Sequence, residues 1–181
     1  MSKLVLVNAV TGSRLVFALP VAVMTFWSRD QTWAILASTI LIIAIEISDL
    51  VDGQLARSSG TVSPFGKLFD PYADSVSRLI VYWSLAIVGR CLAFVPLVMA
   101  IRDVTVSYAR IVMTKRGVDV SARQTGKLKA IVQGVCAGVL MGGPIFWGRW
   151  EQAFVISLST AVVLITVLSM LDYGRAALRA L

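Results

Sequence analysis

Six apolar stretches of about 20 residues follow one another along the chain, and they restrict the possible folds more than any other feature. A bilayer core of about 30 Å is crossed by roughly 20 residues of α-helix. Hydrophobic residues make up 57% of the chain and charged residues 15%, whereas soluble domains contain about 45–50% and about 25%. The sequence therefore predicts an all-α fold, a polytopic membrane bundle of six transmembrane helices. We expect one domain over residues 1–181, with spans at 4–27, 33–56, 71–89, 91–114, 128–148 and 152–173.

The first residues lack the pattern of a secretory signal peptide. The apolar run of residues 4–7 is soon interrupted by Asn8, Thr11 and Arg14, and no small-residue cleavage site follows at a suitable distance. We therefore expect this segment to remain in the mature protein as part of the first span.

The chain contains no histidine and two cysteines, Cys91 and Cys136. The absence of histidine excludes Ser–His and Cys–His nucleophilic schemes and zinc sites built on histidine. Because the cysteines belong to apolar spans far apart in the sequence, we expect them to pack as small hydrophobic side chains.

Basic residues are distributed unevenly between the two sides of the predicted bundle. If the N-terminus is cytoplasmic, ten Lys and Arg residues lie on the cytoplasmic side, three on the opposite side and four inside the spans. This bias predicts that both chain ends face the cytoplasm. Topology and anionic lipid then explain the net charge of +7, so no nucleic-acid partner is expected.

Five acidic residues gather at the predicted cytoplasmic ends of the second and third spans: Glu46, Asp49, Asp52, Asp70 and Asp74. Ionisable residues at membrane depth are costly, which makes them candidates for function. On a helix, Asp49 and Asp52 are about 60° apart, and Asp70 and Asp74 are about 40° apart. Because consecutive antiparallel helices meet at the same edge, we expect the four aspartates to converge. Carboxylate oxygens favour Mg²⁺ or Mn²⁺, which also bind substrate phosphates.

Small residues accompany the aspartates at helical spacing. Gly53, Ala56 and Gly66 leave space on the acid-bearing faces, either for a ligand or for close helix packing. Arg57 is placed to meet a phosphate or an acidic partner. The polar residues 58–69, which include a glycine and a proline, are predicted to form a loop at the membrane surface.

These residues together form a recognisable pattern. The run Asp49-x-x-Asp52-Gly53-x-x-Ala56-Arg57, eight residues, then Gly66-x-x-x-Asp70-x-x-x-Asp74 resembles the signature of the CDP-alcohol phosphatidyltransferase family at every fixed position. The resemblance extends along the whole chain, because Asn8, Thr11, Arg14 and Pro20 are similar to the family's first-helix pattern.

The resemblance implies a donor site and a mechanism. Metal ligation, by two Mg²⁺ or Mn²⁺ ions, is implied for Asp49, Asp52, Asp70 and Asp74. Contacts to the CDP-lipid, here CDP-diacylglycerol, are implied for Asn8, Thr11, Gly53, Ala56, Arg57 and Gly66. Asp74 is the implied catalytic base, which takes the proton from the acceptor hydroxyl before CMP leaves. A homodimer in the inner (cytoplasmic) membrane of a bacterium, surrounded by membrane lipid and with a cytoplasmic active site, is also implied.

A cationic set indicates the acceptor. Arg102 and Arg110 lie in the fourth span, and Lys127 and Lys129 follow at the start of the fifth. Arginine and lysine favour phosphate oxygens, so these four residues are predicted to bind the phosphate of a small phosphorylated alcohol. The pattern resembles the family branch that uses glycerol 3-phosphate. It departs from that branch at Ser75, where lysine is expected, and at residues 101–103, where Ala-Arg-Glu is expected, so inositol phosphate stays an alternative acceptor.

Several charged residues have two interpretations. Arg14 either extends its charge toward the membrane surface, as long cationic side chains do, or contacts substrate. We expect Glu46 to form a salt bridge with Arg14 or Arg102 rather than to bind metal. Arg78 lies one helical turn beyond Asp74, where it can pair with that aspartate.

Two other classes of protein compete with a phosphatidyltransferase. A small cation or proton transporter also carries intramembrane acids, but these usually lie near the bilayer middle or along a pathway. A relative that binds CDP-lipid without catalysis is expected to lack one of the signature aspartates, and all four are present.

Overall fold

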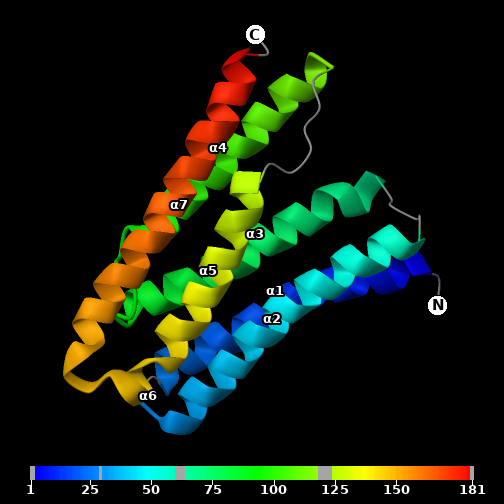
Figure 1. Ribbon diagram of the computed structural model, residues 1–181. Coiled ribbons are helices and arrows are strands. Elements are labelled where there is room, and N and C mark those ends of the chain that lie inside the picture. Colours follow the sequence, from blue (N-terminus) through cyan, green and yellow to red (C-terminus); the bar gives the residue numbers. More distant parts are fainter. Residues whose placement is uncertain (1–2, 29, 60–63, 118–123, 180–181) are drawn as a thin grey trace.

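The computed structural model describes residues 3–28, 30–59, 64–117 and 124–179, and these form helices joined by short turns (Figure 1). Within the described residues there is no β-strand, so the predicted all-α fold is confirmed. The long helices are α1 (Lys3–Trp27), α2 (Thr32–Ser59), α3 (Pro64–Ile87), α4 (Val95–Lys115), α5 (Gln124–Gly142) and α7 (Glu151–Arg179). A short helix, α6 (Pro144–Trp147), and a 3₁₀ turn, η1 (Gly148–Trp150), connect α5 to α7.

The start of α3 differs from the sequence prediction. We predicted a loop over residues 58–69, yet α2 continues to Ser59 and α3 begins at Pro64. Proline suits the first position of a helix, because its missing N–H needs no partner there and its φ is already helical. Polar composition had therefore indicated a loop where the chain forms the first turn of a helix.

The predicted fifth span is also too long. It was expected to end at residue 148, but α5 ends at Gly142 and a separate helix begins at Pro144. Pro144 has no N–H to continue the α5 ladder. Gly89 ends the helical conformation after α3. Its φ of +79° is left-handed, and glycine adopts that conformation without a Cβ clash.

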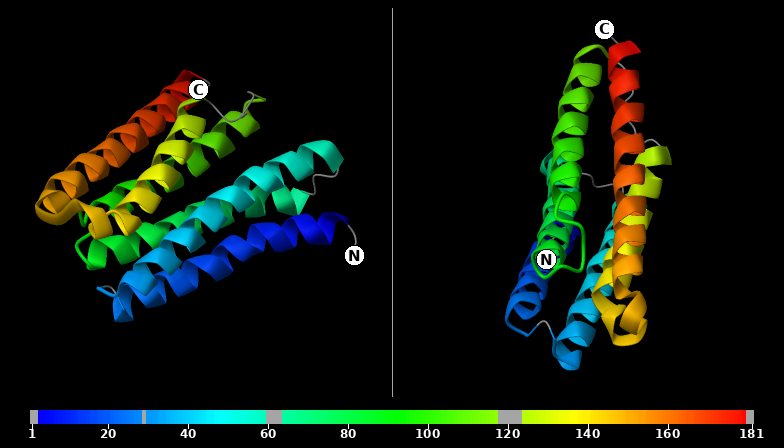
Figure 2. Two further views of the ribbon diagram at one scale, coloured as in Figure 1. Left: turned by 60° about the horizontal axis from the view of Figure 1, so that its bottom comes forward. Right: turned by 90° about the vertical axis from the view of Figure 1, so that its left-hand side faces the viewer.

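The long helices form two groups that pack against each other, α1, α2 and α3 in one group and α4, α5 and α7 in the other. Helix α1 packs against α2 and α3, and α7 packs against α4 and α5, while α2 and α3 contact α5 and α3 contacts α4. Figures 1 and 2 show that the turns after α1, α3 and α5 lie toward one end of the molecule. The beginning of α1 and the ends of α2, α4 and α7 lie toward the other end.

Charged and polar side chains are buried beside the apolar core, and many large apolar side chains are exposed. The buried residues include Arg14, Arg78, Arg102, Lys129 and Gln133, together with an apolar cluster around Tyr82, Leu85 and Leu140. Large apolar side chains point outward instead, as on α4 at Leu97, Ile101 and Val104. Soluble monomers rarely expose apolar surface on this scale, whereas lipid-facing helices require it.

Hydropathy alone supports fewer spans than the sequence analysis predicted. In the described part of the chain, one helical stretch, Pro144–Arg179, is both long and apolar enough to cross a membrane. Gly12–Trp27 and Thr32–Ser48 are apolar but shorter. Charged residues such as Arg78, Arg102 and Lys129 lower the hydropathy of the remaining helices, so six spans stay a prediction. Cys91 and Cys136 are free and buried in the apolar core, as expected.

Truncating a buried residue of α7 should destabilise the bundle more than truncating an outward-facing one. Val162 is fully buried against the core, whereas Leu164 is 59% exposed. Val162→Ala is expected to lower the free energy of unfolding by about 1–2 kcal/mol, because the neighbouring helices cannot close the cavity completely. Leu164→Ala should have little effect, since lipid or detergent contacts that position in both variants. Thermal unfolding in detergent measures both, and equal losses would contradict the packing described here.

Candidate active site

The structure describes only part of the predicted site. Eight predicted site residues are described only as helical backbone of α1, α2 or α3, and nothing is described of their side chains. They are Asn8, Thr11, Asp49, Asp52, Gly53, Ala56, Arg57 and Gly66. Their assigned roles therefore stay predictions. The side chains of Asp70, Asp74, Arg102, Arg110, Lys127 and Lys129 are described.

Asp70 forms an ion pair with the first helix. Arg14 Nη2 lies 3.2 Å from Asp70 Oδ1, and the Arg14 side chain is fully buried while that of Asp70 is 51% exposed. Arg14 therefore does not extend toward the membrane surface, and that interpretation is wrong. The contact joins α1 to the signature segment of α3 and leaves the aspartate accessible.

Asp74 is paired with an arginine on its own helix, one turn away. Arg78 Nε lies 3.2 Å from Asp74 Oδ1, as the spacing suggested. Arg78 also contacts Glu46, with its Nη2 atom 2.9 Å from Oε2. Glu46 therefore forms a salt bridge, as predicted, but with Arg78, a partner that the sequence analysis did not name, because α2 and α3 bring Arg78 within its reach.

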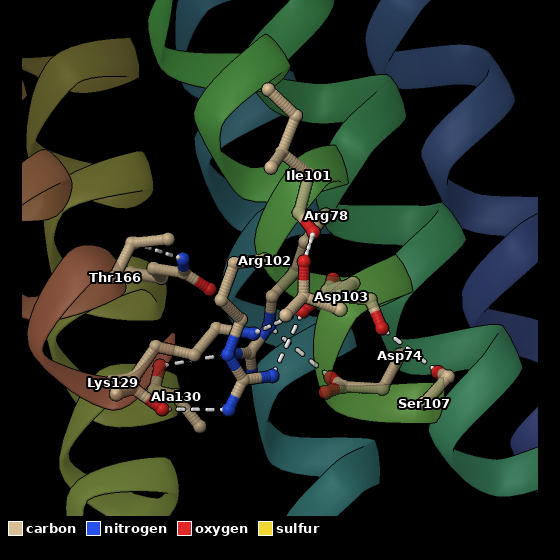
Figure 3. A network of polar contacts seen from close by, with 12 residues as sticks. Asp74, Arg78, Ile101, Arg102, Asp103, Ser107, Lys129, Ala130 and Thr166 are labelled. Carbon is tan, nitrogen blue, oxygen red and sulfur yellow. Dashed lines mark hydrogen bonds and ion pairs between the residues drawn. The ribbon is translucent and has the colours of Figure 1, made fainter. Parts of the chain in front are cut away.

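A second polar cluster joins α4, α5 and α7. Arg102 Nη1 lies 2.8 Å from Asp103 Oδ1, and Lys129 Nζ lies 3.2 Å from the same oxygen atom. The other terminal nitrogen of Arg102 donates to Ser169 Oγ at 2.7 Å. Ser75, which follows Asp74, also hydrogen-bonds Asp103. Figure 3 shows that Asp74 and Arg78 lie beside Arg102, Asp103 and Lys129 in one polar network.

Tyr173 on α7 brings the two predicted arginines together. The guanidinium carbons of Arg102 and Arg110 lie 5.5 Å and 5.4 Å from the centre of its ring. Arg110 Nη2 also donates to the tyrosine hydroxyl at 3.3 Å. Gly126 lies close to the tyrosine, since a Cβ atom there would be 3.2 Å from the hydroxyl oxygen. Cation–π contacts of this kind hold the guanidinium groups against α7.

The fourth predicted cation is placed differently. Lys127 is exposed, whereas Lys129 is buried, because residues two apart on a helix point in directions about 200° apart. The structure therefore groups Arg102, Arg110 and Lys129 and leaves Lys127 at the surface.

Sequence reasoning missed the contribution of α7. Ser169 and Tyr173 both contact the predicted arginines. They belong to a stripe on the buried face of α7 that also includes Ser159, Val162 and Thr166. The alternating spacing of three and four residues was visible in the sequence, and polar residues along such a stripe indicate a face turned toward the protein interior.

The donor chemistry of the aspartates fits a hard divalent cation. Asp70 and Asp74 offer carboxylate oxygens, and the chain has no histidine to favour zinc. Within the described residues no three acidic, histidine or cysteine side chains gather closely enough to hold a metal ion. A complete site therefore needs Asp49 and Asp52, whose side chains are outside that part of the chain.

The second cluster carries an excess of positive charge. In the described part of the chain, Asp103 is the carboxylate that contacts both Arg102 and Lys129, and Arg110 lies against the same tyrosine as Arg102. Arginine in such surroundings favours a phosphate through paired, charge-assisted hydrogen bonds. The arrangement is suited to bind an anion next to Asp74.

Removing the shared carboxylate should destabilise the fold strongly. Asp103→Asn leaves Arg102 and Lys129 buried without their counter-charge, and breaking a buried ion pair in this way costs about 3–5 kcal/mol. Unfolding in detergent measures the loss. Glu151→Gln, at an exposed position at the start of α7, is the matched control and should be nearly unchanged. Equal stability of the two variants would show that Asp103 does not neutralise the cluster.

Comparison with known proteins identifies the family of this chain. Residues 4–172 match the family model for CDP-alcohol phosphatidyltransferase. The probable phosphatidylglycerophosphate synthase of Mycobacterium tuberculosis strain H37Rv is 31% identical over 155 residues, which cover 84% of this chain and 68% of that protein.

Two further relatives carry the name CDP-diacylglycerol–glycerol-3-phosphate 3-phosphatidyltransferase. The protein from Mycoplasma genitalium is 34% identical over 80% of this chain and 59% of its own length. That from Treponema pallidum is 35% identical over 52% of this chain and 44% of its own length. The family match extends over nearly the whole chain and includes both halves of the aspartate signature. The chain therefore belongs to the CDP-alcohol phosphatidyltransferase family, whose members use CDP-diacylglycerol and an alcohol acceptor.

Proposed function

We propose that the protein transfers the phosphatidyl group of CDP-diacylglycerol to glycerol 3-phosphate, forming phosphatidylglycerophosphate and releasing CMP. The observation that carries this proposal is the position of Arg102 and Lys129 beside Asp74. Arg110 joins them through Tyr173, whose ring it shares with Arg102. An acceptor with a hydroxyl at one end and a phosphate at the other matches a base next to an anion site. The names of the relatives support the same acceptor.

The aspartates provide the donor half of the site. Two Mg²⁺ or Mn²⁺ ions would be held by Asp49, Asp52, Asp70 and Asp74. The residues around the nucleotide would be Asn8, Thr11, Gly53, Ala56, Arg57 and Gly66. When bound, the metal neutralises the pyrophosphate charge and aligns the reacting phosphorus. Phosphoryl transfer needs chiefly such positioning and electrostatic stabilisation, so the lack of histidine is no obstacle.

Asp74 would act as the general base. Arg78 contacts one of its oxygen atoms, Oδ1, and the carboxylate accepts the proton of the acceptor hydroxyl. The hydroxyl oxygen forms a bond to the lipid-side phosphorus while the bond from that phosphorus to the CMP oxygen breaks. CMP leaves with the electron pair of that bond. A positioned carboxylate next to the reacting hydroxyl can carry out this proton transfer without a high intrinsic basicity.

The cationic cluster would hold the acceptor phosphate. Arg102 and Arg110 are kept side by side by Tyr173, and Lys129 approaches from α5. Lys127 would contribute from the surface. Inositol phosphate carries the same kind of phosphate group, so acceptor choice depends on the space around the hydroxyl and is resolved by the assay below.

We place the protein in a bacterial cytoplasmic membrane as a six-span homodimer, with its termini and active site on the cytoplasmic side. Outward apolar side chains on α1, α2, α4, α5 and α7 support immersion in lipid. The excess of Lys and Arg at the end of the bundle that holds the termini supports this orientation. A transporter is less consistent with the structure, because Glu46, Asp70 and Asp74 are each paired with an arginine.

An acceptor panel tests the proposal. Purified protein in lipid–detergent micelles is supplied with CDP-diacylglycerol and Mg²⁺, then offered glycerol 3-phosphate, inositol 1-phosphate, free inositol or serine, while CMP release is measured. Glycerol 3-phosphate should give the fastest release. A preference for inositol 1-phosphate would change the acceptor but keep the phosphate site, whereas a preference for serine or free inositol would contradict it.

The roles of Asp70 as a metal ligand and Asp74 as the general base should be separable by mutation. Chelation by EDTA is expected to abolish turnover, and Mg²⁺ or Mn²⁺ should restore it. Asp70→Asn should abolish turnover and weaken CDP-diacylglycerol binding, because the pyrophosphate is held through metal. Asp74→Asn should lose most turnover and keep more donor affinity. Full activity after thorough chelation, or near wild-type turnover of Asp74→Asn, would show that this assignment is wrong.

Removing Arg110 should affect the acceptor selectively. A charge-assisted hydrogen bond to phosphate contributes roughly 1.5–3 kcal/mol, so Arg110→Ala should raise KM for glycerol 3-phosphate about ten- to a hundredfold. KM for CDP-diacylglycerol should hardly change. Arg149→Ala, an exposed arginine stacked on Trp150, is the control. Equal changes in both constants for Arg110→Ala would indicate a structural role.

A further inference from the structure

Arg78 is held from three helices at once. Its Nη2 atom lies 2.9 Å from Glu46 Oε2 on α2, and its Nη1 atom donates to the carbonyl oxygen of Ala130 on α5 at 2.9 Å. Its Nε atom faces Asp74 on its own helix α3 at 3.2 Å. Two nitrogens of the guanidinium thus hydrogen-bond different helices, and the third faces Asp74 in an ion pair rather than a hydrogen bond. Because the group is planar and rigid, the three partners fix its orientation as well as its position.

A glycine makes the contact with α2 possible. Gly134 lies on α5, one turn beyond Ala130, and a Cβ atom there would overlap the Glu46 carboxylate, with Cδ only 2.5 Å away. Glu46 therefore lies directly against the α5 backbone. Any larger residue at this position has to displace the Glu46 carboxylate, which is the group that contacts Arg78. Gly138, one further turn along α5, has nothing within 4 Å of the equivalent position.

Little water reaches Arg78 itself, although Glu46 and Asp74 are partly exposed. The Arg78 side chain is only 5% exposed. A cavity of about 10 Å³ adjoins Glu46 and Arg78, and the rest of its wall is formed by Ile42, Ile45, Val81, Tyr82 and Ala137. This volume holds one water molecule at most. A guanidinium in such surroundings depends on its protein partners, so a shift of Glu46 is transmitted to Arg78 rather than absorbed by solvent.

We propose that Glu46, Arg78 and Gly134 form a positioning unit that holds Asp74 at a fixed place relative to α5. Ala130, which accepts from Arg78, directly follows Lys129 in the acceptor cluster. The unit therefore connects the aspartate that takes the proton to the pocket that holds the acceptor phosphate. It rests on the proposed function for the roles of Asp74 and Lys129. None of its three members needs to touch substrate.

A purely structural ion pair would have a different signature. Such a pair contributes to stability, and its loss lowers the amount of folded protein without changing the turnover of each folded molecule. A positioning unit acts on kcat, because displacing a reacting group by about 1 Å can cost about a hundredfold in rate. The two substrates are bound by other residues, so their KM values should change little.

The test compares two glycine substitutions on the same helix. Gly134→Ala is expected to lower kcat per folded molecule about ten- to a hundredfold, with both KM values within about threefold of wild type. Gly138→Ala adds the same methyl group one turn away, in open space, and should match wild type. Folded protein is quantified for each variant by size-exclusion chromatography, and turnover by CMP release in the presence of CDP-diacylglycerol and Mg²⁺.

Two further variants identify the route of the effect. In a Glu46→Ala background, Gly134→Ala should cause no additional loss, because the group it displaces is already absent. Arg78→Lys keeps the positive charge but loses the planar set of guanidinium N–H donors. It should therefore lower kcat nearly as much as Arg78→Gln. Rescue by lysine would show that charge alone is required and would overturn the proposal.

Other outcomes also decide the question. Equal kcat values for Gly134→Ala and Gly138→Ala would overturn the positioning unit, as would additive effects of Glu46→Ala and Gly134→Ala. Failure of the proposed function is seen separately, as a wild type that ignores glycerol 3-phosphate. In that case the same variant comparison is made with the acceptor that wild type uses.

Discussion

Charges inside a helical bundle have to be paired, because an isolated charge away from water costs several kcal/mol, and this requirement determines where the helices of this protein meet. Arg14 joins α1 to α3 through Asp70, and Arg78 joins α3 to α2 and α5. Asp103 gathers Arg102 from α4 and Lys129 from α5. Large apolar side chains cover much of the outer surface, and the polar contacts join the helices beside an apolar core.

The same pairing separates two kinds of charge that the reaction needs. Acids near the start of α3 suit a metal-bound pyrophosphate, and the cations of α4 and α5 suit an acceptor phosphate. If the two groups neutralised each other, neither would bind substrate. Arg78 contacts Asp74, and Asp103 contacts Lys129, so each group has a partner of opposite charge within the protein while the acids and cations lie side by side.

The sequence predicted the number and order of the long helices, because runs of about 20 apolar residues have few other solutions. It misplaced the ends at Pro64 and Gly142, where backbone chemistry outweighs composition. Asp74 with Arg78 was predictable from spacing within one helix. Glu46 with Arg78 was not, because partners on different helices depend on which helices are neighbours. Tyr173 was missed for the same reason, since only the fold brings α7 against Arg102 and Arg110.

In the proposed reaction the phosphatidyl group passes directly between two positioned substrates, with no covalent bond to the protein. Isotope exchange tests it most directly: the purified protein is incubated with CDP-diacylglycerol, Mg²⁺ and labelled CMP, in the absence of any acceptor or lipid product. A direct mechanism should leave CDP-diacylglycerol unlabelled over many turnover times, because the phosphatidyl group leaves CMP only when an acceptor hydroxyl attacks. Labelling at a rate comparable to turnover would contradict it, since it requires a phosphatidyl group held by the protein after CMP has left.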